Sequence, residues 1–486
     1  MYADIGIGDM ANDAVSSQSN LDAALLGLTL DRAGAALHEQ LAEALRGLVL
    51  TGRFAGARLP PSRVLAAELS VSRMTVTTAY DQLAAEGYLA ARRGAGTYVA
   101  GDLPHLAPPA RRRPAPPAPP EAPQPFHPGV PDQALFPHRA WARHIERAWR
   151  APEPALLARA DPFGWHPLRV AIAEHLAAWR ALDCAPEQIL VTGGAWDAFD
   201  VIAHALLPPG ARLAIEDPGW PTLHALLRRH GVTPHPLRID GAGLDPAALP
   251  GDAAGAVVTP SRHYPTGVAM PLARRLQVLH WAEASGALVV EDDYDSEFRY
   301  QGQPLPSLAG LDGLRRTIYM GSFSKLLSPT LRIGYLVLPE ALVGRVRDYL
   351  AVTGARASLM PQPALARFMA QGEFATHLRR MRRVYARRQS ALLAALPGPE
   401  WLTVGPDPSG MHLVAGLGPW LQGRVSDRAI AERATARGLA PRALSSHAIL
   451  PHPPQGLLLG YAGFDEDTLG HAGRTLGALL VSAPRG

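Results

Sequence analysis

The sequence of 486 residues contains one lysine, Lys325, and one cysteine, Cys184. Lysine and arginine together number 47, so arginine supplies the other 46 side-chain cations. A single cysteine excludes a disulfide within the chain and a cysteine-based zinc site, and we predict no metal site. No apolar run approaches the roughly 20 residues that a transmembrane helix needs, and the acidic N-terminus does not resemble a signal peptide. We therefore expect a cytoplasmic protein without a membrane segment.

The length of the chain predicts two or three domains. We expect residues 1–20 to be disordered, residues 21–101 to form a first domain and residues 126–486 a second. Ten prolines in 104–125 indicate an extended linker, which we place at residues 102–125. The net charge of +4 is too small to indicate nucleic-acid binding by itself.

The scarcity of lysine makes Lys325 a candidate functional residue. Arginine can replace lysine in most ion pairs, but a guanidinium does not condense with an aldehyde, whereas an amine does. Lys325 is therefore a candidate for a Schiff base with an aldehyde cofactor. The alternative is that a GC-rich genome left one lysine by chance, and the residue alone does not decide between the two.

The first domain has the pattern of a winged helix-turn-helix. Leucines at helical spacing predict a helix over 35–51, and Ser62 and Ser72 are placed to cap helices over 63–69 and 73–86. Two short strands, 87–90 and 97–99, follow as a flap. Six residues are candidates for DNA contacts, at the start of a helix or at the tip of the flap: Arg63, Ser72, Arg73, Thr75, Arg92 and Arg93. The alternative is a small helical domain for protein contacts.

Several motifs of this domain resemble the GntR winged-helix family in their order. They are Leu37-His38-Glu39-Gln40-Leu41, Leu59-Pro60-Pro61-Ser62-Arg63, Leu69-Ser70-Val71-Ser72-Arg73, Glu86-Gly87-Tyr88 and Gly94-Ala95-Gly96-Thr97-Tyr98-Val99. The resemblance implies binding to double-stranded DNA.

The second domain alternates helical patterns with short apolar runs, which predicts an α/β fold with a largely parallel sheet. The predicted strands are 188–191, 212–215, 255–258, 287–290, 317–320 and 334–338. Ligands of such sheets bind at the carboxyl ends of strands. We therefore consider the residues that follow three of these strands.

Gly194, Ala195 and Trp196 follow the first strand in a small-residue turn of the kind that binds phosphate through backbone N–H groups. A plain tight turn is the alternative. Asp292 and Tyr294 follow the strand 287–290 and would share one face of it, opposite Glu291 and Asp293. A carboxylate and a phenol side by side suit the ring nitrogen and ring hydroxyl of a pyridine cofactor. A hard-cation site is the rival interpretation.

Ser322, Ser324 and Lys325 follow the strand 317–320, and Arg332 lies shortly after. Hydroxyls and a guanidinium near one lysine indicate a phosphate anchor beside a Schiff base. Ser-x-x-Lys also occurs in penicillin-recognising enzymes, but their further Lys-Thr-Gly strand has no counterpart in a chain with one lysine.

Residues 126–486 resemble the aminotransferase-type, fold type I, pyridoxal 5′-phosphate domain, and with the GntR domain the chain resembles the MocR family of transcriptional regulators. The motifs are Phe136-Pro137, Gly164 with Leu168-Arg169, Glu216-Asp217-Pro218-Gly219-Trp220, Tyr264-Pro265-Thr266-Gly267, 291–298 and 321–325. The resemblance implies pyridoxal 5′-phosphate on Lys325, Asp292 at the pyridine nitrogen and Tyr294 at the ring hydroxyl. It implies that Trp220 stacks on the ring, and that the phosphate is held by Gly194, Ala195, Trp196, Ser322, Ser324 and Arg332. It also implies a homodimer, often head-to-tail.

The chain departs from the family pattern at three places. Arg262-His263 replaces His-Gln before Tyr264, and Arg159 stands where a tyrosine reaches the partner's phosphate. Residues 457–462 lack the arginine that holds a substrate carboxylate in many aminotransferases, so Arg332 or Arg442 would have to do so.

We therefore expect a pyridoxal-phosphate-dependent regulator that binds DNA and senses the cofactor, an amine or an amino acid. One alternative is a working aminotransferase with an accessory DNA-binding domain. Another is a DNA-binding protein whose large domain binds no cofactor.

Overall fold

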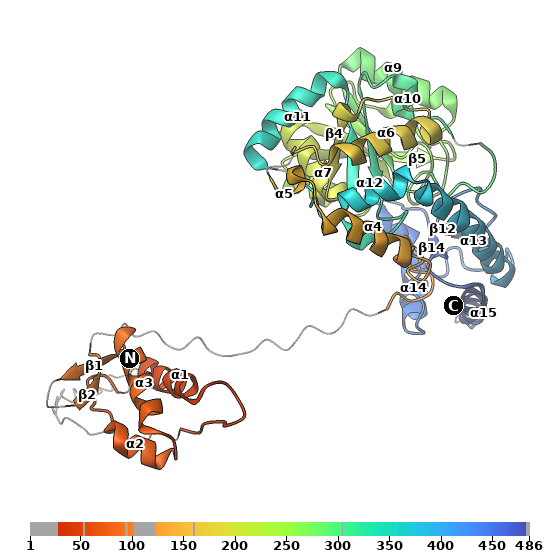
Figure 1. Cartoon of the computed structure of the whole chain (residues 1–486). Coiled ribbons are helices and arrows are strands. Elements are labelled where there is room, and N and C mark those ends of the chain that lie inside the picture. The colour runs from red at the N-terminus through yellow and green to blue at the C-terminus, as the bar shows by residue number, and fades with distance from the viewer. Residues whose placement is uncertain are drawn as a thin grey trace, which may run out of the picture. The chain divides into compact units, whose positions relative to one another are not determined.

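A computed structural model describes residues 28–51, 54–92, 96–101, 122–158, 161–303, 305–354 and 356–482. The chain forms two compact units that divide between Pro120 and Glu121 (Figure 1). The predicted disordered tail and residues 102–121 of the predicted linker lie outside the described residues. No helix of the described ranges is long and apolar enough to span a membrane.

The small unit is a winged helix-turn-helix, which confirms the predicted fold. Its elements are α1 (Leu37–Leu50), α2 (Ser62–Glu68), α3 (Arg73–Ala85), β1 (Leu89–Arg92) and β2 (Gly96–Val99). The two strands pair antiparallel, with Leu89 opposite Val99. Leu41 and Leu45 of α1 are buried against Val76 and Leu83 of α3, so the leucines at helical spacing form the core of this unit.

The caps of the two short helices differ from each other. Ser72 caps α3 as predicted, since its Oγ accepts a hydrogen bond of 3.0 Å from the Thr75 N–H. The prediction that Ser62 caps α2 is wrong, because α2 begins at Ser62 itself, behind Pro61, and has no side-chain cap. A proline before the first helical residue has no N–H and fixes the backbone there, so it starts the helix without a hydroxyl.

The large unit contains one large sheet, one smaller sheet and the helices around them. The strands of the large sheet are β3 (Ile189–Thr192), β4 (Arg212–Asp217), β5 (Thr233–Asp240), β6 (Gly243–Leu244), β7 (Gly255–Val258), β8 (Leu288–Asp293), β9 (Thr317–Ser322) and β10 (Gly334–Val337). Within the described residues their order is β3-β10-β9-β8-β7-β4-β5-β6. β5, β4, β7, β8 and β9 run parallel to one another, as predicted for a largely parallel sheet.

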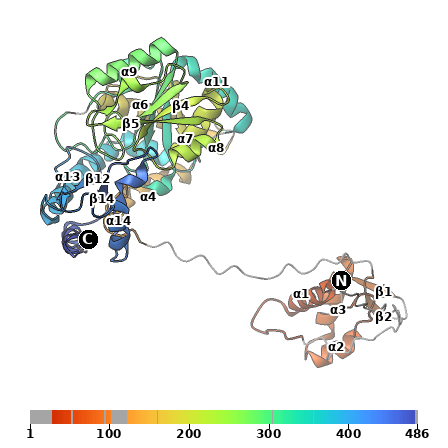
Figure 2. The ribbon, with the colours of Figure 1, turned by 180° about the vertical axis from the view of Figure 1, so that it is seen from behind.

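Helices cover both faces of this sheet (Figures 1 and 2). One face packs on α7 (Ala195–Val201), α8 (Leu223–Arg229) and α11 (Glu340–Thr353), and the other on α6 (His166–Arg180), α9 (Leu272–Ser285) and α12 (Gln362–Ala370). Neighbouring strand residues therefore face different layers: Val290 joins the core of the first face and Val289 that of the second. Burial on both faces explains why the strands are continuous apolar runs.

β10 runs antiparallel between β3 and β9, and this brings two loops together. Its first residue, Gly334, pairs with Thr192 at the end of β3 and with Ser322 at the end of β9. The loops that leave β3 and β9 consequently start at the same edge of the sheet. A Cβ on Gly334 would lie 3.1 Å from the Gly194 Cα, so the close approach requires glycine.

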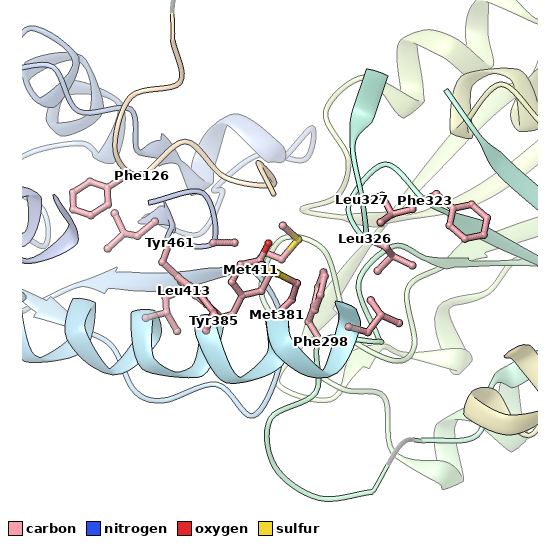
Figure 3. Close-up of a cluster of buried hydrophobic side chains, with 14 of the residues drawn as sticks. Phe126, Phe298, Phe323, Leu326, Leu327, Met381, Tyr385, Met411, Leu413 and Tyr461 are labelled. Carbon is pink, nitrogen blue, oxygen red and sulfur yellow. The ribbon is translucent and has the colours of Figure 1, made fainter. Parts of the chain in front are cut away.

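The C-terminal part forms an antiparallel sheet in the order β11-β12-β14-β13, counted over the described residues. The remaining elements are α4 (His138–Arg150), α5 (Pro154–Leu157), α10 (Leu308–Asp312), α13 (Glu373–Ala395), β11 (Leu402–Thr403), β12 (His412–Leu417), α14 (Asp427–Thr435), β13 (Arg442–Ala443), β14 (Gly456–Gly460) and α15 (Glu466–Val481). Figure 3 shows the buried cluster that joins the two sheets along α13, from Phe126 and Tyr461 to Phe323 and Leu326. Because Leu326 and Leu327 belong to this cluster, the chain beside Lys325 is held by the core.

Candidate functional site

The Lys325 side chain lies largely buried just after β9. Its Nζ donates a hydrogen bond of 2.8 Å to the Gly129 carbonyl. Gly129 has φ +73°, which favours glycine, and a Cβ on it would lie 2.8 Å from Nζ, so a side chain there would displace the amine. Burial and the charge of Arg442 lower the pKa of Lys325, whereas Asp295 and Asp292 raise it less. A lowered pKa favours the neutral amine, which is the nucleophilic form.

Asp292 lies near the end of β8, within electrostatic reach of Lys325. Burial, and then the charges of Asp293 and Asp295, raise its pKa to about 7. Among the described residues, its carboxylate has no hydrogen-bond or ion-pair partner. Glu291 and Asp293, by contrast, both pair with the buried Arg180 on the other face of the strand. Among these three carboxylates of the described strand, the unpartnered one is therefore Asp292, whose charge reaches the lysine.

Tyr294 is held by Arg262. The guanidinium donates hydrogen bonds to the Tyr294 hydroxyl at 3.0 Å, to Asp407 Oδ2 at 2.8 and 3.1 Å, and to the His412 carbonyl at 2.8 Å. It also forms an ion pair of 3.4 Å with the buried Asp295. Because Arg262 donates to the phenol oxygen, the phenol's own O–H remains free to donate to a ligand. Sequence reasoning noted Arg262 only as a departure from the family pattern.

The small-residue turn after β3 and the loop after β9 meet at the start of β10. Gly194, with φ +109°, is the N-cap of α7, whose first residues are Ala195 and Trp196. Arg332 is exposed, and its guanidinium lies beside Gly194. Its Nη1 is 3.8 Å from the position that a Cβ at residue 194 would take. Ser322 ends β9, and its Oγ accepts a hydrogen bond of 3.1 Å from the Ser324 N–H. The positive end of a helix, two hydroxyls and a guanidinium that has no partner among the described residues are suited to a phosphate.

Trp220 contacts the same turn. Its ring lies 5.4 Å from that of Trp196, edge to face, and 6.2 Å from that of Phe199. Trp196 itself is 45% exposed. Arg159, predicted to reach a phosphate, lies outside the described residues.

Arg442 is a further cation near Lys325. It lies on β13, is exposed, and its side chain has no hydrogen-bond or ion-pair partner in the ranges that the structure describes. Burial, and then the charge of Arg442, lower the pKa of His127, and the same charge adds to the burial that lowers the pKa of Lys325. Burial raises the pKa of Tyr264, and the charge of Arg442 opposes that rise. Tyr264 in turn contacts His447, with 3.2 Å between the phenol oxygen and Nε2. The sequence indicated Arg442 as one of two carboxylate clamps and Tyr264 as part of a family motif, but it did not indicate His127 or His447.

Most of the predicted DNA-contacting residues are exposed in the small unit. Arg63, Ser72, Arg73 and Arg92 are exposed, and Thr75 is half-buried. The Ser72 hydroxyl also lies 2.8 Å from the Thr75 hydroxyl, so the two are partly occupied in capping α3. Arg92 stacks on Tyr98 with its guanidinium 4.6 Å from the ring centre. Arg93 lies outside the described residues.

Comparisons with known proteins match both units. Residues 37–99 match the family "Bacterial regulatory proteins, gntR family", and residues 137–471 match "Aminotransferase class I and II". The two matches define a DNA-binding regulator with an aminotransferase-like domain. Aminotransferase domains of this class use pyridoxal 5′-phosphate, and the unpartnered Asp292 carboxylate near a buried lysine fits that cofactor, which we therefore assign to the large unit.

Several relatives are regulators over nearly their whole length. The probable rhizopine catabolism regulatory protein MocR of Rhizobium meliloti is 40% identical, over 91% of this chain and 93% of its own. The pyridoxine biosynthesis transcriptional regulator PdxR of Corynebacterium glutamicum is 37% identical, over 88% and 93%. The chain belongs to the MocR family of GntR-type transcriptional regulators.

A solved structure supports the assignment of the large unit. The α-aminoadipate aminotransferase LysN of Thermus thermophilus, solved with N-(5′-phosphopyridoxyl)-L-leucine, is 28% identical. It superposes with a TM-score of 0.65 over 73% of this chain and 91% of its own. The predicted fold class and cofactor are confirmed.

Proposed function

We propose that this regulator is a cytoplasmic homodimer whose DNA binding responds to pyridoxal phosphate and to a small amine or amino acid bound beside it. One observation carries the proposal: the only lysine of the chain is largely buried, and the charges of the Asp292 carboxylate and the Arg442 guanidinium both reach it. An amine, an anion and a cation so arranged suit an aldehyde cofactor and a carboxylate-bearing ligand.

We assign the cofactor contacts as follows. Pyridoxal phosphate supplies an aldehyde that condenses with primary amines and a protonated ring that withdraws electrons. Lys325 would attach the cofactor, Asp292 would accept a hydrogen bond from its ring nitrogen, and Tyr294, fixed by Arg262, would donate to its ring hydroxyl. The phosphate would be bound by Gly194, Ala195, Trp196, Ser322, Ser324 and Arg332, with Trp220 stacked on the ring and Arg159 contributed across a dimer.

Arg442 is the better of the two candidates for an effector carboxylate. Arg332 lies beside Gly194 at the phosphate turn, so the phosphate would engage it. Arg442 is equally free of partners among the described residues, but its charge reaches Lys325 and Tyr264 instead. A carboxylate there would neutralise the guanidinium that lowers the pKa of Lys325. An effector with both an amino and a carboxylate group would engage both residues.

A ligand can change DNA binding only if it binds two arrangements of the protein with different affinity. The head-to-tail dimer provides such arrangements, because the spacing of two winged helices determines which pairs of half-sites they reach. In the small unit, Arg63, Ser72, Arg73 and Thr75 would contact the DNA from α2 and α3, and Arg92 and Arg93 from the flap.

The test combines a visible spectrum with DNA binding. We expect the purified protein to absorb as a lysine-bound pyridoxal phosphate, and Lys325→Ala to lose this band but retain its fold. Arg442→Ala should keep the band while the concentration of amino acid needed to change it rises at least tenfold. Fluorescence anisotropy with labelled DNA from the upstream region of its own gene should change with cofactor in the wild type and not in Lys325→Ala. A colourless wild type, or identical DNA binding by both, would contradict the proposal.

A second candidate is a working aminotransferase, which the complete set of Lys325, Asp292 and Tyr294 favours. It predicts sustained keto-acid formation from added amino acid. The sensor predicts a spectral change that stops after about one equivalent per chain, so one titration separates the two.

A further inference from the structure

Two histidines and an aspartate meet on the surface of the large unit, where α7 ends. Asp200 is in α7, His204 follows in a π-helical turn (Ile202–Leu206), and His230 caps the C-terminal end of α8. Asp200 Oδ1 lies 3.2 Å from His204 Nδ1 and 3.4 Å from His230 Nδ1. The three candidate ligand atoms all lie within 4.8 Å of one another. Both imidazoles therefore direct a nitrogen at the same carboxylate oxygen.

These separations suit a tetrahedral ion. Zinc binds imidazole nitrogen and carboxylate oxygen at roughly 2.0–2.2 Å, which places two ligands of a tetrahedron about 3.3–3.5 Å apart. The two distances from Asp200 Oδ1, 3.2 and 3.4 Å, lie within about 0.1 Å of this range. His204 Nδ1 also lies 3.0 Å from the Asp200 carbonyl oxygen, so the ring, whose side chain is 43% exposed, would turn away from that carbonyl to complete the site. π-helical turns inside helices occur frequently at functional sites, and here the turn places His204 beside Asp200.

The second oxygen of Asp200 is already fixed. Its Oδ2 accepts hydrogen bonds from Arg356 and, at 3.3 Å, from the Tyr349 hydroxyl. The His204 ring stacks on the Tyr349 ring at 6.2 Å with 5° between the planes. Partners of this kind orient metal ligands in proteins and raise metal affinity. Because these partners contact Oδ2, the other oxygen, Oδ1, is the one that lies beside the two histidines.

We propose that Asp200, His204 and His230 bind a divalent transition-metal ion of the zinc type, with water in the remaining position. Two imidazoles favour such an ion over calcium or magnesium, which prefer oxygen ligands. The sequence analysis predicted no metal site, because it considered only cysteine clusters and the carboxylates around Asp292.

The site adjoins the phosphate turn through charged contacts. Arg356 also donates a hydrogen bond of 2.6 Å to Asp197 Oδ1, and Asp197 Oδ2 accepts one of 2.7 Å from the Gly193 N–H. An ion on Asp200 Oδ1 would share this carboxylate with Arg356, which is held on Oδ2. The geometry thus links metal occupancy to the turn before α7.

The test measures zinc binding by the full-length protein in competition with a chromophoric chelator. We expect one site per chain, and His204→Ala and His230→Ala should each weaken it at least tenfold. His166→Ala is the matched control, because that exposed histidine faces Glu187 at 3.5 Å without a second imidazole. Lys325→Ala should bind zinc like the wild type, which separates this site from zinc on the cofactor.

Thermal unfolding shows whether the variants fold. Without metal, each histidine variant should unfold at the temperature of the wild type, and zinc should raise that temperature only for the wild type and His166→Ala. Equal zinc affinity in the wild type and His230→Ala would overturn the proposal, as would wild-type binding no tighter than millimolar. If His204→Ala alone retained full affinity, the site would not be the one described.

Discussion

Replacing Arg262 by methionine tests the network at the candidate site. The guanidinium is 3% exposed and contacts Asp407, Asp295, Tyr294 and the His412 carbonyl. Methionine fills similar volume but leaves the buried Asp295 without its cation. Breaking one partner of a buried ion pair costs about 3–5 kcal/mol, so we expect a loss of this size in the free energy of unfolding. Burial already raises the pKa of Asp295 to about 7, and its protonation limits the loss.

The nine tryptophans make the measurement specific, because all of them lie after residue 140. Tryptophan fluorescence therefore follows the large unit alone during urea unfolding. With an m-value of roughly 3 kcal/mol/M, the expected loss moves the midpoint by about 1–1.7 M. Arg274→Met is the control, since the Arg274–Asp240 ion pair lies at the surface and should contribute far less.

A double variant identifies the cause. Asp295→Asn removes the charge that Arg262 neutralises, so Arg262→Met should cost less in that background, by about 1–3 kcal/mol. Additive losses, or an Arg262→Met variant within about 1 kcal/mol of the wild type, would refute an electrostatic role for this arginine.

Three further predictions concern the salt dependence of DNA binding, the pH dependence of stability and the effect of a side chain at residue 129. Arg73→Ala should lower the slope of log affinity for DNA against log salt by about 1, whereas Arg46→Ala should not, because Arg46 is paired with Glu86. The pKa of Asp292 is raised from 3.8 to about 7, so in cofactor-free protein its contribution to stability falls as pH rises from about 4 to 7. Asp292→Asn should remove that decrease in urea unfolding, and an unchanged pH profile would count against the assignment. Gly129→Ala, at φ +73° and 2.8 Å from the lysine amine, should reduce the cofactor bound per chain, read from absorbance.

Local sequence signals predicted much of the fold. Each of the six predicted strands overlaps an observed one, because strands buried on both faces are apolar throughout. β5 was not among them, since Pro234 and Pro236 argue against a strand. β5 lies next to the edge of the sheet, and its outer neighbour among the described residues is the two-residue strand β6. The carboxylates of 291–293 were expected after their strand, but β8 includes them.

The candidate site was partly predictable, again where a residue stands out in its local sequence. Lys325 and Asp292 stand out in the sequence, the first by its rarity and the second by its place at a strand end. The roles of Arg262 and Arg442 depend on contacts with residues from distant segments, such as Asp407, which no local pattern reveals. The same holds for His230, which reaches Asp200 only after α8 packs beside α7.

A chain with one lysine offers a single side-chain target to acylating reagents. Burial in the absence of the cofactor lowers the pKa of that amine, which keeps more of it in the form that such reagents modify. Attachment of a cofactor would protect it. Mass spectrometry of one peptide would therefore report the loaded fraction of the protein inside cells, without purification and without an assay of gene control.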